Sequence, residues 1–153
     1  MLPPAMVSTP EKDDAASIIW LVGEAFRLSR RWVEEIVREH GITATQLAIL
    51  KRVDLFPGMS RVELARQTFI SPQAAQVAIA TLEEKGLVNR RAAQGGRAVR
   101  TQLTPKGRRL MNACTEATEP ALEKLVAPLD TEERRTLVEL LSRCLEGHAQ
   151  PRP

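Results

Sequence analysis

Two helix-start signals stand eleven residues apart in the middle of the chain, and they constrain the fold more than any other feature of the sequence. Ser60 with Glu63 forms a capping-box pattern, so a short helix is expected from there to residue 67 or 68. Ser71 followed by Pro72 is a second start signal, because serine caps a helix and proline fits its first position. This second helix ends at Gly86. Two short helices joined so tightly are the outline of a helix-turn-helix.

The residues after this pair of helices change from helical to strand-like periodicity. LVNRRA at 87–92 and AVRTQL at 98–103 are short segments with β-branched residues, and apolar and polar residues alternate in the second. The AQGG stretch between them favours a turn, because glycine takes positive φ without strain. The sequence therefore predicts a β-hairpin behind the helix-turn-helix, which together make a winged helix.

Amphipathic helices are expected on both sides of this unit. Apolar residues recur three and four apart over 17–39, 104–126 and 130–146, and Thr43 with Gln46 opens one more helix. Pro120 lies inside the second long segment and should kink or interrupt it. The expected fold is mainly α with a small β-hairpin wing. The long helices carry more apolar surface than one winged helix can cover, which indicates an interface between chains.

A chain of 153 residues is long enough for one domain with its own core. Its expected organisation is a flexible N-terminal arm (1–14), a dimerisation helix (15–40), a winged helix-turn-helix (41–104), C-terminal dimerisation helices (105–146) and a flexible tail (147–153).

The charge of the chain is concentrated in one segment. Residues 85–109 hold eight basic residues and no acidic one, whereas the rest of the chain holds 14 basic and 19 acidic residues. Exposed surfaces normally mix both signs, so this asymmetry is typical of a surface that meets phosphate or an anionic membrane.

Several classes of function are not expected. No apolar run approaches the length of about 20 residues that a membrane span needs, and the N-terminus lacks the order of a signal peptide. We therefore expect a cytoplasmic protein, without membrane partners. The two histidines, His40 and His148, are far apart, and Cys114 and Cys144 lack a CxxC spacing, so no metal site or cofactor is expected. Both thiols are expected to be buried and inert. No catalytic constellation is present, so an enzyme is not expected.

The order of elements, together with four strings, resembles the MarR family of bacterial and archaeal transcriptional regulators. The strings are GITATQLAIL at 41–50, VELARQ at 62–67, LEEKGLVNR at 82–90 and RAVRTQLTPKG at 97–107. The resemblance implies a homodimer that presents two winged helices to a pseudo-palindromic operator in double-stranded DNA. It also implies a repressor that is associated with the nucleoid when bound to DNA, and a small aromatic or phenolic anion as effector.

The expected DNA contacts fall into two groups. The outward side of the second short helix is expected to read bases, because glutamine pairs with adenine and small apolar groups touch thymine methyl groups; its candidates are Ser71, Gln73, Ala74, Gln76 and Val77. Contacts to the DNA backbone and by the wing are expected from Thr81, Arg90, Arg91, Arg97 and Arg100. Arg97 matches the family's wing-tip arginine, which the resemblance places in the minor groove.

Two departures from the family pattern keep an alternative open. The family usually has aspartate where this chain has Gly95, and many members carry arginines near Val77 and Thr81, where this chain has none. The alternative is a dimeric interaction module on the same fold that has weak or lost specific DNA binding. Gln73 and Gln76 would then be ordinary solvated helix surface.

The effector site is expected to combine aromatic rings with a cation. The candidates are Trp20, Phe26, Arg27, Trp32, Phe56 and Met59. Arg27 would pair with a carboxylate, while packing in the core or the dimer is the alternative role of the aromatic rings. The family's peroxide-sensing branch is not expected, because the first helix has no cysteine and the chain has no tyrosine.

Overall fold

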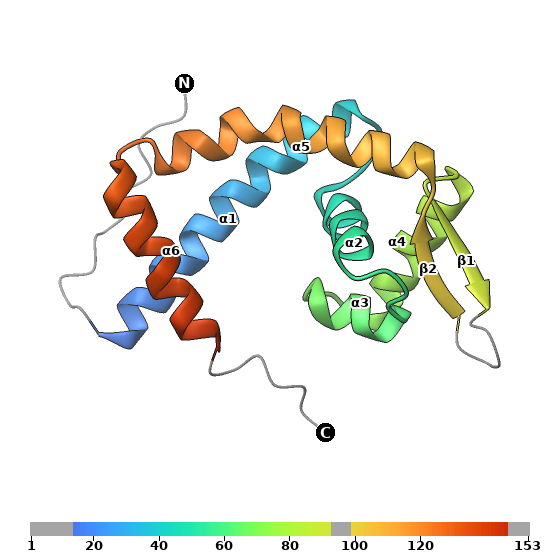
Figure 1. Cartoon of the computed structure of the whole chain (residues 1–153), viewed down its shortest axis with the longest axis horizontal. Coiled ribbons are helices and arrows are strands. Elements are labelled where there is room, and N and C mark those ends of the chain that lie inside the picture. Colours follow the sequence, from blue (N-terminus) through green and yellow to red (C-terminus); the bar gives the residue numbers. More distant parts are fainter. Residues whose placement is uncertain (1–13, 93–98, 147–153) are drawn as a thin grey trace.

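The structure, a computed structural model, describes residues 14–92 and 99–146 (Figure 1). The elements in chain order are α1 (Ala15–Glu39), α2 (Ala44–Leu55), α3 (Arg61–Gln67), α4 (Pro72–Glu84), β1 (Val88–Ala92), β2 (Val99–Leu103), α5 (Pro105–Val126) and α6 (Thr131–Glu146). The predicted fold class, mainly α with one hairpin, is confirmed.

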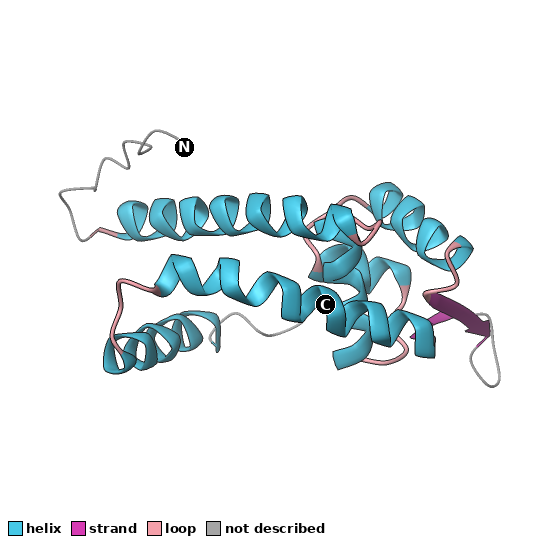
Figure 2. Cartoon of the chain, turned by 90° about the horizontal axis from the view of Figure 1, so that it is seen from above, coloured by secondary structure: helices cyan, strands magenta, loops and turns pink. Residues whose placement is uncertain are grey.

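The elements separate into a compact unit and a set of long helices. Figure 1 shows α2, α3, α4 and the two strands gathered at one end of the molecule, while α5 runs from this unit toward α6 at the other end. The long helices α1 and α5 lie side by side, as Figure 2 shows from above. We call α2, α3, α4 and the two strands the winged unit, and α1, α5 and α6 the helical arm. The winged unit is joined to the helical arm at both of its ends, through α1 before it and α5 after it.

The predicted helix starts are formed by the expected side chains. Thr43 accepts from Gln46 N at 3.1 Å, and the Gln46 side chain accepts from Thr43 N at 3.0 Å. The same reciprocal pair forms between Ser60 and Glu63. The helix α1 begins at Ala15, two residues before its apolar periodicity, because Asp14 caps the helix by accepting from Ser17 N at 2.8 Å. The remaining residues of the predicted arm lie outside the described residues, as does the predicted tail at 147–153.

A close contact fixes the start of α5 to the end of α4. Thr104 Oγ1 donates to Gly86 O at 2.7 Å, and Lys106 Nζ donates to Lys85 O at 2.8 Å. A Cβ on Gly107 would lie 1.9 Å from Leu87 O, so only glycine allows this approach. The contact gives a physical reason for the glycine of the LTPKG string. It also connects the C-terminal end of α4 directly to the helical arm.

The helix α5 continues through Pro120 without interruption. Of the two expected effects of this proline, a kink or an interruption, the interruption does not occur, although Pro120 has no N–H to donate to the preceding turn. Packing of α5 along α1 stabilises the helix.

Apolar side chains of α1 and α6 are exposed in the single chain. No residue of α6 is buried, and its exposed apolar side chains are Leu137, Val138, Leu140, Leu141 and Leu145. The N-terminal half of α1 exposes Ile18, Ile19, Trp20, Leu21, Val22 and Phe26. Cys144 is exposed on α6 too, so the expectation of two buried thiols holds only for Cys114. None of the described helices is long and apolar enough to cross a membrane.

Candidate nucleic-acid interface

The helix α4 has one buried and one exposed side. Ala75, Ile79 and Leu82 are fully buried in the core of the winged unit. Gln73, Gln76 and Val77 are exposed, and their spacing of three and four residues places them on one face of the helix. The division of α4 into an inward and an outward side follows the sequence pattern.

The other candidates at α4 are Ser71, Ala74 and Thr81, and the two hydroxyl groups among them bind backbone atoms of this helix. Ser71 is the N-cap, and its side chain accepts from Ala74 N at 3.1 Å, which uses one lone pair of the hydroxyl oxygen and leaves its proton free for another partner. Ala74 is exposed and presents only a methyl group. Thr81 is half-buried, and its hydroxyl donates to Val77 O at 3.0 Å. The part of this surface that can donate to base edges is therefore concentrated in the first half of α4.

The two strands of the wing pair antiparallel, with Val88 opposite Leu103 and Arg91 opposite Arg100. The backbones of Arg90 and Arg91 lie in β1, but their side chains are not among those described. Gly95 and Arg97 lie outside the described residues altogether. The predicted roles of these residues stay predictions.

The side chain of Arg100, a predicted DNA contact, lies against the loop before α3. Its guanidinium lies beside Gly58, where a Cβ would come within 3.0 Å of Nη1. Arg100 also contributes to lowering the pKa of the Glu63 carboxyl, although the larger causes are the hydrogen bonds of that carboxyl with Ser60. Arg100 thus connects β2 to the loop before α3, and the side chain itself is exposed.

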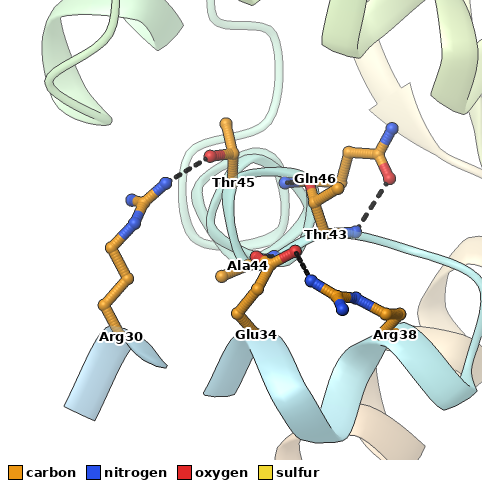
Figure 3. A network of polar contacts seen from close by, with 7 residues as sticks. All are labelled: Arg30, Glu34, Arg38, Thr43, Ala44, Thr45 and Gln46. Carbon is orange, nitrogen blue, oxygen red and sulfur yellow. Dashed lines mark hydrogen bonds and ion pairs between the residues drawn. The ribbon is translucent and has the colours of Figure 1, made fainter. Parts of the chain in front are cut away.

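A polar network that sequence reasoning missed joins α1 to α2 (Figure 3). The Glu34 carboxylate accepts from Ala44 N, the first N–H of α2, at 2.7 Å, and lies 4.0 Å from the Arg38 guanidinium. Arg30 donates to Thr45 Oγ1 at 2.8 Å. The only sequence signal was the spacing of Glu34 and Arg38 by four residues, which does not reveal the contact with α2. The orientation of the winged unit on α1 therefore depends on side chains outside the predicted set.

Comparison with known proteins places this geometry in a family. The MarR family profile matches residues 40–98, which span the helix-turn-helix and much of the hairpin. HTH-type transcriptional repressor Rv2887 of Mycobacterium tuberculosis is 30% identical over 132 residues, which cover 83% of this chain and 95% of the relative. This chain belongs to the MarR family. The resemblance of the sequence strings to the family is confirmed.

Two solved structures of MarR proteins match the whole arrangement. Rv2887 in complex with p-aminosalicylic acid has a TM-score of 0.74 at 26% identity, covering 83% of this chain and 97% of that one. Wild-type MarR of E. coli in its apo form has a TM-score of 0.75 at 25% identity, covering 84% and 96%. The similarity includes the long helices as well as the winged unit, because both matches cover more than four fifths of this chain.

None of the described pockets of this MarR chain is lined by more than one of the candidate effector residues. Trp20, Phe26 and Phe56 are exposed, Trp32 is half-buried, and Met59 packs against the core. Of the predicted set, only Arg27 lines a described pocket. This pocket, of about 480 Å³, is lined by Leu21, Glu24, Ala25, Arg27, Leu28, Arg31 and Leu125.

Charge in the pocket between α1 and α5 is partly satisfied within the chain. Arg27 forms an ion pair with Glu24, whose side chain is 26% exposed. Arg31, which the sequence reasoning did not single out, also lines the pocket. The pocket therefore offers two guanidinium groups and one carboxylate beside leucine side chains.

A second pocket lies where the ends of α1 and α4 meet the start of α5. Its volume is about 630 Å³, and it is lined by His40, Gly41, Ile42, Lys85, Leu87, Lys106, Arg109 and Leu110. The Lys85 ammonium donates to Gly41 O and the Lys106 ammonium to Lys85 O, so two of its cations bind helix-end carbonyls. In the described part of this MarR chain, these lysines thus close the junction of α1, α4 and α5.

Proposed function

We propose that this MarR-family chain is a transcriptional repressor that binds a pseudo-palindromic operator in double-stranded DNA as a homodimer. The observation that carries the proposal is the exposed face of α4, where Gln73, Gln76 and Val77 lie opposite a fully buried side. Glutamine can pair with adenine in the major groove, and valine can touch a thymine methyl group. The relative Rv2887 supports this, because it is a transcriptional repressor and has been solved in complex with DNA. The protein would then act in the cytoplasm, on the nucleoid, as a regulator and not as an enzyme.

The dimer is supported by the exposed apolar surface of the helical arm. Leu141 and Leu137 of α6 have 38% and 40% of their surface exposed, and no side chain of this face is buried by the described part of the chain. A second copy of the chain buries it and brings two α4 helices to successive major-groove faces about 34–36 Å apart. Binding strength comes from the basic segment 85–109, so the affinity should fall steeply with salt.

Release by a small aromatic or phenolic anion is part of the same proposal. Rv2887 has been solved with p-aminosalicylic acid and with salicylic acid. In this chain, the pocket between α1 and α5 presents Arg27 and Arg31, either of which can pair with a carboxylate. An aromatic anion bound there would contact α1, through which Glu34 and Arg30 hold α2.

The alternative, an interaction module with weak or lost specific DNA binding, is favoured by one observation. The helix α4 contains no lysine or arginine between Pro72 and Glu84. Direct readout would therefore depend on uncharged side chains.

Fluorescence anisotropy with the chain's own upstream DNA and a scrambled duplex, over a salt series, separates these two functions. The repressor is expected to prefer one duplex by about a thousandfold or more at moderate salt. Replacing both glutamines (Gln73→Ala with Gln76→Ala) should weaken binding to that duplex by roughly tenfold or more and leave the scrambled duplex unaffected. Asn112→Ala, an exposed amide on α5, is the matched control and should bind like wild type. Equal affinity for every duplex at moderate salt would support the interaction module instead.

A further inference from the structure

The turn between α3 and α4 contains the only described residue other than glycine with positive φ. Phe69 has φ of 55°, in the left-handed region. Its N–H donates to Arg66 O at 3.3 Å, and the N–H of Ile70 donates to Ala65 O at 3.1 Å. These two bonds are those of a Schellman motif at the end of α3. Glycine is the residue that usually occupies this position, because a Cβ makes the left-handed conformation unfavourable.

The Phe69 side chain does not offset this backbone strain by packing within the protein. It is 89% exposed, which is the highest value among the exposed large hydrophobic side chains of the described residues. The next residue, Ile70, packs against the core and satisfies the apolar contact of the motif. Single exposed apolar residues are common, and so are strained turns. Phe69 combines an exposed apolar side chain with a strained backbone, and the described part of the chain shows no compensating contact of its ring.

The location of Phe69 favours DNA as the partner of this ring. The residue stands two positions before Ser71, the N-cap of α4, and therefore at the end of the helix whose first half carries the proposed base contacts. The first turn of α4 contains no acidic residue, and the exposed Arg66 is three residues away on α3. An electropositive helix N-terminus beside an arginine attracts a polyanion. Phenylalanine is one of the side chains that contact thymine methyl groups in the major groove.

We propose that Phe69 is a specificity-determining residue, whose ring contacts the C5-methyl group of a thymine at the edge of the major groove that α4 enters. This proposal rests on the proposed function, since it requires that the chain binds a preferred DNA sequence. Strain in the free protein is then retained because the side chain stabilises the complex. The position therefore exchanges stability of the fold for recognition of DNA.

The variant Phe69→Gly tests both parts of the proposal, because it removes the ring and also the backbone strain of a residue with positive φ. The melting temperature is expected to rise by about 2–4 °C. Affinity for the preferred duplex is expected to fall by roughly tenfold, as for a large apolar side chain that is no longer buried. Phe69→Leu, which keeps an apolar side chain, should retain part of the affinity. Leu55→Ala removes another exposed apolar side chain, on α2, and should bind like wild type.

Replacing thymine by deoxyuridine, one position at a time, identifies the contact itself. Loss of one methyl group should weaken wild-type binding by about fourfold at one thymine of each half-site. The same substitution should leave the Phe69→Gly variant unaffected. Identical sensitivity of both proteins at every thymine would overturn the proposal, and so would a lower melting temperature of Phe69→Gly. A wild-type protein with no preferred duplex would instead overturn the proposed function, and with it this role of Phe69.

Discussion

The two cysteines of this protein differ in burial, although both lie on apolar faces of helices. Cys114 and Cys144 both occupy apolar stripes of long helices, yet Cys114 is fully buried and Cys144 is exposed. Burial raises the pKa of the Cys114 thiol above its ordinary value, and the charge of Lys51 opposes this only in part. The neutral thiol is therefore the stable form at physiological pH, and it is a poor nucleophile.

The raised pKa of Cys114 predicts a silent thiol in the native protein. In a Cys144→Ser variant at pH 8, Ellman's reagent should titrate less than about a tenth of a thiol per chain until guanidinium chloride exposes Cys114. Because the pKa of the Cys114 thiol is higher in the folded protein, this thiol favours folding below its ordinary pKa. Its contribution to stability is lost as the pH rises through the pKa that the thiol has in the folded protein. Rapid reaction of the native variant at pH 8 would show that Cys114 is accessible.

Elements whose ends carry local signals were predictable, whereas contacts between elements were not. The starts of α2, α3, α4 and α5 are encoded by capping residues three positions from their partners, and the hairpin by a change of period. The Glu34 contact with α2 depends on how two helices cross, which no sequence spacing records. The same limit applies to the effector candidates, because an aromatic residue on an apolar stripe can face a cavity, the core or another chain.

The contact between Glu34 and α2 is expected to stabilise the junction of the two helices. Glu34→Ala removes the acceptor of Ala44 N and a negative charge from the N-terminus of α2. The free energy of unfolding should fall by about 1 kcal/mol, as for the loss of a helix cap. Urea denaturation at fixed protein concentration measures this change. Glu35→Ala, at the next and more exposed position of α1, is the matched control and should stay within about 0.5 kcal/mol of wild type. Equal stability of the two variants would mean that the Glu34 bond contributes nothing.

Two exposed surfaces, one partly polar and one apolar, lie on different parts of the structure. The winged unit carries the exposed, uncharged face of α4, and the helical arm carries the apolar faces of α1 and α6. The α5 helix and the Gly107 contact join the two parts, so the C-terminal end of α4 is held against the start of α5. Recognition of a two-fold symmetric DNA site requires both surfaces to act in the same assembly.

Native mass spectrometry of the protein mixed with its preferred duplex tests this account most directly, because it counts chains on DNA. The expected complex contains two chains on one duplex. Leu141→Glu places a charge in the apolar face of α6 and should give single chains that do not form the complex, whereas Ser142→Glu, at the neighbouring exposed position, should still give two chains. One chain on a duplex for the wild type, or an unaltered complex for Leu141→Glu, would contradict a dimeric repressor built on this face.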